Sequence, residues 1–114
     1  MSMKPNFNPS LTLRGGNTEV AAGGPLGWTD PGRRCTIEVT ITQRLDSGEV
    51  VARGESEEYV SPAPTWDAVA RIDHPDRFLR PGPAMAWGKV RVSGGPTLEP
   101  DEWTNTIELR KRAR

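Results

Sequence analysis

The chain has 114 residues, which is enough to enclose one hydrophobic core but not two, so a single domain is expected. Its 15 basic and 15 acidic side chains cancel, which removes the long-range field that would draw the whole protein to nucleic acid or to an anionic membrane. Cys35 is the only cysteine, which excludes an internal disulfide and therefore the disulfide-stapled class of secreted domains.

Turn-forming residues are abundant, with 12 Gly and 11 Pro beside an apolar fraction of 34%. This composition approaches that of disordered chains, but four Trp and several alternating runs of Val, Ile and Thr favour a folded domain. We interpret residues 1–9 as an extended arm, residues 10–110 as one β domain and residues 111–114 as a basic tail. No segment has the character of a signal peptide or reaches the ~20 apolar residues of a membrane span, so a cytoplasmic location is expected.

The first predicted strands are short. Leucines flank a threonine at residues 11–13, and residues 18–22 form a second candidate that a Gly-Gly-Pro sequence is expected to end. Residues 25–34 are predicted to form a loop. Within it, Leu26 and Trp28 are expected to pack onto the body of the domain.

The clearest period-two pattern covers residues 35–45, where apolar side chains alternate with Thr, Glu and Arg. This pattern predicts a strand with one buried face, and residues 49–60 are expected to return as its partner. If the turn between them is two residues long, Leu45 pairs with Val50. Gly54 is then expected to mark a bend or bulge in a long hairpin.

Three further segments complete the set. Residues 66–72 alternate as a strand, although the same residues also fit a short helix. The segment after them is irregular and is expected to be anchored by Phe78 and Leu79. Residues 84–92 alternate again, and the small residues on one of their faces imply that another group packs very close there. Residues 103–110 form the last predicted strand.

The count is about seven short strands with turn chemistry between them and no long helix. This arrangement favours an all-β fold, and we predict an antiparallel β-sandwich of about seven strands, of immunoglobulin, fibronectin-III or jelly-roll type.

Few residues are suited to catalysis or metal binding. His74 is the only histidine, and its turn sequence favours a solvated residue over a general base. Cys35 is expected to face the core, and zinc would need several Cys or His ligands. Glu55 and Glu57 have a spacing that would suit inverting glycoside hydrolysis, but a solvated acidic stripe is the favoured interpretation. We predict no catalytic residue, no metal and no cofactor.

Tryptophan is the most informative residue type in this sequence. Trp66 and Trp103 are expected in the core. Trp87 shares the outward side of its predicted strand with Lys89 and Arg91, so these three residues are the predicted binding site. An indole that only stacks beneath neighbouring basic side chains is the structural alternative.

These observations favour a non-catalytic protein-interaction or assembly module that binds a protein partner or copies of itself. Contact would be made through an open strand edge or through the Trp/Arg patch. A carbohydrate- or small-ligand-binding module that uses exposed Trp is the alternative. Basic residues at positions 33–34 and 110–114 could contact phosphates, but overall neutrality argues against nucleic acid as a partner. A membrane partner is not predicted either.

Overall fold

The computed structural model describes residues 5–29, 32–46, 48–73, 77–93 and 102–111. In these ranges every regular element is a β-strand. The strands, in chain order, are β1 (Ser10–Arg14), β2 (Glu19–Trp28), β3 (Arg34–Leu45), β4 (Gly48–Glu55), β5 (Tyr59–Val60), β6 (Ala63–Ile72), β7 (Gly82–Ser93) and β8 (Glu102–Lys111).

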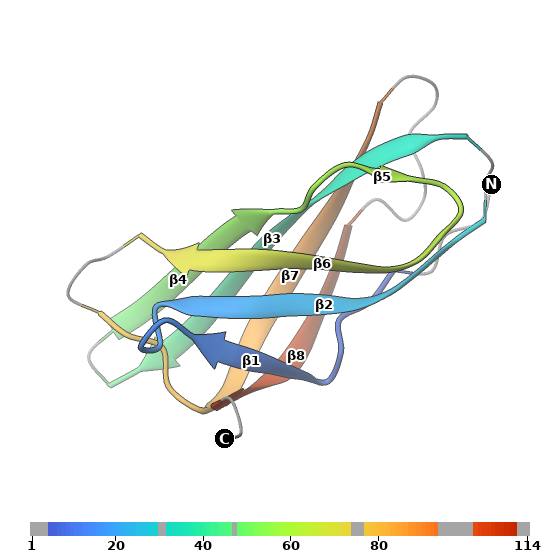
Figure 1. Cartoon of the computed structure of the whole chain (residues 1–114). Helices are drawn as coiled ribbons and strands as arrows, with labels where there is room; N and C mark the ends of the chain where they lie inside the picture. The colour runs from blue at the N-terminus through green and yellow to red at the C-terminus, as the bar shows by residue number, and fades with distance from the viewer. Residues whose placement is uncertain (1–4, 30–31, 47, 74–76, 94–101, 112–114) are drawn as a thin grey trace.

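The strands close into a barrel (Figure 1). Hydrogen-bonded neighbours follow the order β4-β6-β2-β1-β8-β7-β3, and β3 pairs back to β4, so seven strands form a ring. The short β5 pairs with the start of β3. Neighbouring strands are antiparallel except β1 and β8, which run parallel from Ser10↔Glu108 to Leu13↔Lys111. The fold is therefore a closed, mixed barrel.

The predicted antiparallel sandwich is wrong, whereas the all-β prediction is confirmed. A strand with one buried face shows the same period-two pattern in a sandwich and in a barrel, because alternate side chains point to the core in both. Two strand pairings distinguish the architectures here. The parallel contact of the first strand with the last and the contact of β4 with β6 join what would otherwise be open edges.

Inward-facing side chains of all seven barrel strands fill the interior. Leu26 and Trp28 are fully buried, which confirms that they pack onto the body. Ile37, Ile41 and Leu109 are fully buried with them. The barrel interior is thus a packed core.

An aromatic cluster extends this core. The Phe7 ring is buried, with its centroid 5.4 Å from that of Trp66 and 5.7 Å from that of Trp103. The indole N–H of Trp66 donates to the carbonyl oxygen of Asn6 at 3.0 Å, which holds the N-terminal segment against the barrel. The predicted core position of Trp66 is confirmed, and Trp103 packs against the core while partly buried.

β2 is longer than the sequence predicted. Residues 23–25 do not end it, and the strand continues to Trp28, so the loop predicted over residues 25–34 is wrong over residues 25–28. The amide of Asn8 donates to the carbonyl oxygen of Gly23 at 2.8 Å. A Cβ at Gly23 would lie 2.9 Å from the carbonyl oxygen of Trp66 on β6. The glycines therefore allow neighbouring backbones to approach the strand and do not form a turn.

The β3–β4 hairpin has a different register from the one predicted. Leu45 pairs with Gly48 and not with Val50, a shift of two residues. A shift of two leaves the same side chains facing the core, so the alternation alone could not detect it. Gly54 is required by a close approach, because a Cβ there would overlap the carbonyl oxygen of Val69 on β6.

The segments around β6 and β7 match the sequence in part. β6 is a strand over residues 63–72, so the helical alternative is wrong. Gly88 on β7 is covered by Trp103, whose Cζ2 would lie 2.5 Å from a Cβ at that position, which confirms the predicted close packing. Leu79 is fully buried and its amide donates to a backbone carbonyl at 3.0 Å, but Phe78 is 51% exposed and does not anchor the segment.

Candidate functional site

The outward side chains of β3, β7 and β8 form a grid, which we call the Trp87 face. β7 lies between the two other strands, and its inward side chains are small, so its large residues point outward. The strand registers align three rows across the face, Thr42–Met85–Thr106, Thr40–Trp87–Thr104 and Glu38–Lys89–Glu102. A regular ladder therefore places one large side chain between two side chains of neighbouring strands in each row.

The three predicted site residues all lie on this outer side of β7. Trp87 is partly buried. The ammonium of Lys89 lies 3.8 Å from a Glu102 carboxylate oxygen, and the guanidinium of Arg91 lies 2.7 Å from a Glu38 carboxylate oxygen. Both basic groups are thus matched by an acidic residue on an adjacent strand, so the face carries locally compensated charge.

Met85 is the residue that the sequence interpretation missed. It lies in the row next to Trp87, on the same side of β7, and is 50% exposed. It belongs to the three large apolar residues that the described structure leaves about half exposed; the other two are Val60 and Phe78. The alternation that pointed Trp87 outward applies equally to Met85, so the signal was available. A flexible thioether beside an indole is suited to contact with another protein surface.

Cys35 and His74 were the candidates for nucleophilic chemistry. Cys35 is fully buried, as expected. Desolvation by burial, with a smaller contribution from the charge of Glu58, raises the pKa of its thiol to about 11. A thiol in this state is protonated at neutral pH and is a poor nucleophile. His74 lies outside the described residues.

The described residues offer no group of three His, Cys, Asp or Glu side chains arranged to hold a metal ion. In the same ranges we find no helical segment capable of spanning a bilayer.

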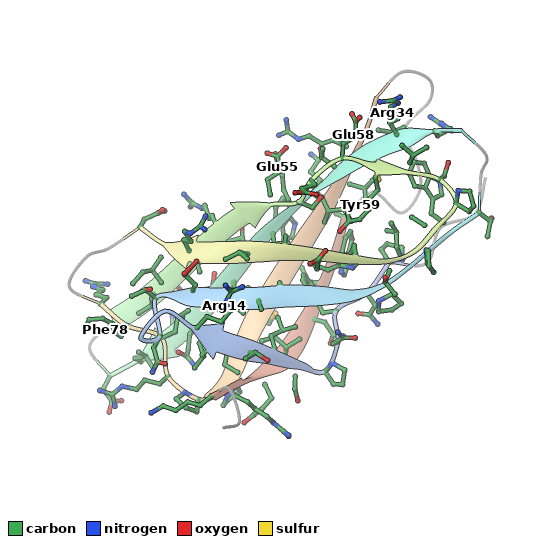
Figure 2. All side chains as sticks on the ribbon, viewed as in Figure 1. Arg14, Arg34, Glu55, Glu58, Tyr59 and Phe78 are labelled. Atoms are coloured by element: carbon green, nitrogen blue, oxygen red, sulfur yellow. The ribbon has the colours of Figure 1, made fainter. Side chains whose placement is uncertain are left out.

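A second polar region lies where β4 separates from β6. Glu55 and Glu57 are both exposed, as the acidic-stripe interpretation expected, and they line a hollow of about 370 Å³ with Tyr59 and Asp67. Figure 2 shows Glu55 and Tyr59 in the part of the molecule where β4 and β5 lie opposite β6. One sign of this region is visible in the sequence, the glycine at position 54.

Comparisons with protein-family models, with curated proteins and with solved structures found no match.

Proposed function

We propose that this protein is a non-catalytic interaction module that associates with a second copy of itself through the Trp87 face. The observation that carries this proposal is the half-exposed Met85 beside Trp87 at the centre of a regular three-stranded surface. Burial of a methionine and part of an indole releases water from apolar surface, which is the main favourable term in protein association.

Charge favours a second copy as the partner. The chain has no net charge, so two copies do not repel one another at long range. In a two-fold contact each face meets itself, and a patch of one sign would then be repelled. Lys89 and Arg91 are already paired with Glu102 and Glu38 on the same face, so this face can meet its copy without uncompensated charge.

The dimensions of the face predict weak association. Two inter-strand spacings of about 4.8 Å, and the six residue steps of about 3.3 Å from Met85 to Arg91, give a grid roughly 10 Å by 20 Å between backbone atoms. Stable interfaces bury about 800 Å² on each partner, so contact over this grid belongs to the small, transient class. Association is expected at high micromolar to millimolar concentration.

Analytical ultracentrifugation from micromolar to millimolar concentration tests the proposal. We expect the weight-average mass of the wild type to rise with concentration and that of Met85→Glu to stay at the monomer value, because a carboxylate would be buried without a partner. Phe78→Glu is the matched control. It places the same charge at an equally exposed apolar residue outside the Trp87 face and should associate like the wild type.

A wild type that remains monomeric at millimolar concentration would refute self-association. Equal loss of association in both glutamate variants would place the contact elsewhere or show a general effect of charge. Thermal unfolding of each variant, followed by circular dichroism, separates lost association from lost folding.

A carbohydrate- or small-ligand-binding function is the second candidate, because the indole of Trp87 is partly exposed. A sugar ring stacked on it would quench or shift its fluorescence. A glycan panel that changes the emission of the wild type, but not that of Trp87→Phe, would favour this function over self-association.

A further inference from the structure

Two backbone pairs of the described residues join β4 to β6, a region we call the seam. These pairs are Ala52↔Ile72 and Arg53↔Arg71. Just beyond these pairs, Gly54 allows the strands to cross, since any Cβ there would overlap the backbone of Val69. The strands then separate and enclose the hollow described above.

Beyond Gly54 the two segments that flank the seam are hydrogen-bonded to different strands. The amide of Ser56 donates to the carbonyl oxygen of Ile37 at 2.8 Å, and Tyr59 pairs with Cys35, so this side follows β3. β6 follows β2 through pairs that continue to Pro25↔Thr65. Within the described residues, β6 has no strand paired to its seam edge between positions 64 and 70.

A side chain occupies the place of the missing strand. The Tyr59 hydroxyl accepts a hydrogen bond from the Asp67 amide at 2.7 Å. Its own proton can be donated to the Asp67 side chain at 2.9 Å or to the Asp67 carbonyl oxygen at 3.1 Å. The amide and carbonyl of Asp67 therefore point into the seam. Because alternate residues of a strand direct these groups to the same edge, Thr65 presents its groups on this side too, whereas the carbonyl of Val69 on the same edge is covered by Gly54.

The charge of the seam selects the kind of segment that would fit. Glu55, Glu57 and Asp67 line the hollow, and Arg71 is the one basic residue among the described residues that line it. The Arg71 guanidinium already lies 3.0 Å from a Glu19 carboxylate oxygen, so it does not compensate these three acidic groups. Because Gly54 covers the carbonyl of Val69, the open edge runs from Thr65 to Ala68, a length of ~10 Å that is enough for about three residues of an added strand.

We propose that the seam edge of β6 binds an extended, lysine- or arginine-rich segment of a partner protein as an added strand. The segment's backbone pairs with β6 in place of the Tyr59 hydroxyl, and its basic side chains meet Glu55, Glu57 and Asp67. Burial raises the pKa of Tyr59, so this hydroxyl is protonated and can hold Asp67 until the segment arrives. This surface adjoins the Trp87 face where Glu55 pairs with Glu38, but it uses the backbone of β6, so different variants test the two proposals.

Amide NMR titration of the full chain with synthetic peptides tests the proposal. The probe is a short peptide that alternates lysine with valine, and the controls replace lysine with glutamate or the central valine with proline, which cannot complete a strand ladder. We expect only the lysine–valine peptide to shift the amides of Thr65 and Asp67, to slow their hydrogen exchange, and to bind less tightly as salt is added.

Two variants and one control show whether the seam is responsible. Glu57→Lys should weaken peptide binding by about three- to tenfold. Glu49→Lys makes the same charge change at an exposed position at the other end of β4 and should have little effect. Tyr59→Phe frees the backbone of Asp67 and should tighten binding by about fivefold, a gain that loss of a merely structural hydrogen bond would not give.

Equal binding of the glutamate peptide, equal effects of Glu57→Lys and Glu49→Lys, or no binding at millimolar peptide would each overturn the proposal. Shifts that centre on Trp87 would also overturn it. Met85→Glu should bind the lysine–valine peptide like the wild type. Peptide binding can therefore be interpreted even if the self-association test fails.

Discussion

The wall formed by β3, β7 and β8 carries the Trp87 face. This wall and the seam between β4 and β6 differ in how their backbone amides and carbonyls are hydrogen-bonded. On the wall, β3 and β7 pair without interruption from Arg34↔Ser93 to Thr42↔Met85. At the seam two pairs of described residues join the strands, and beyond Gly54 the Tyr59 hydroxyl bonds the backbone of Asp67. The wall can therefore contact a partner only through side chains, whereas the seam can also offer backbone donors and acceptors.

The substitution Gly54→Ala tests most directly whether the seam depends on the close approach of β4 to β6. The added methyl would overlap the carbonyl oxygen of Val69, and a backbone atom in a paired strand cannot move aside. We expect the free energy of unfolding to fall by about 3 kcal/mol, the range of overpacking in a tight site, as measured by urea denaturation.

Arg53→Ala is the control for that substitution. Arg53 is the neighbouring residue, and its exposed ion pair with Asp73 at 3.4 Å should contribute less than about 0.5 kcal/mol. Val69→Ala should not rescue Gly54→Ala, because the contact is with the carbonyl and not with the side chain. A cost of Gly54→Ala no larger than that of Arg53→Ala would mean that the seam is not held by close approach.

Gly88→Ala makes the corresponding test on the wall. Here the added methyl meets the indole of Trp103, with Cζ2 2.5 Å away, and a side chain can be shortened. We expect a loss of about 2 kcal/mol in the wild-type background and a much smaller loss in the Trp103→Phe background. A double-mutant cycle by urea denaturation measures this coupling, and a coupling of zero would contradict the assigned contact.

The wall was also the part of the fold most accessible from sequence. Alternation in residues 35–45 and 84–92 predicted both strands, their inward sides and the exposed side of Trp87, because a half-buried strand imposes a period of two wherever it lies. The same period could not reveal the register of the β3–β4 hairpin or the closure of the sheet into a barrel. A shift by two residues and a change of architecture both leave that period unaltered.

The seam was not predictable in the same way. Its one sequence sign, Gly54, was interpreted as a bend, since an isolated glycine does not reveal which backbone approaches it. Tyr59 and Asp67 carry no pattern that links them across the seam. Gly23 was interpreted as a turn for a similar reason, although it lies within β2 and admits the Trp66 backbone. Close approaches between distant segments depend on tertiary structure and leave no local period.

Cys35 gives a smaller effect that depends on pH. Burial raises the pKa of its thiol to about 11 in the folded chain from 9.0, so the folded state holds the proton more tightly. The contribution to stability is fully present below pH 9 and is lost as pH rises toward 11, because only the unfolded thiol ionises in that window. Relative to Cys35→Val, the wild type should lose about 1 kcal/mol of unfolding free energy between pH 8 and pH 10. Parallel pH profiles for the two proteins would contradict the burial of the thiol.

The smallest expected effects concern the ion pairs of the Trp87 face. Arg91 lies 2.7 Å from Glu38, whose side chain is 26% exposed, whereas Lys89 lies 3.8 Å from the more exposed Glu102. Arg91→Ala should therefore lower the unfolding free energy by about 0.5–1 kcal/mol and Lys89→Ala by less than about 0.5 kcal/mol. Both losses should shrink in molar salt, which screens exposed charges. If Lys89→Ala proves the costlier in urea denaturation, the pairing on this face differs from the one described. Such small values would mean that these charges contribute little to folding, although they leave the face without uncompensated charge.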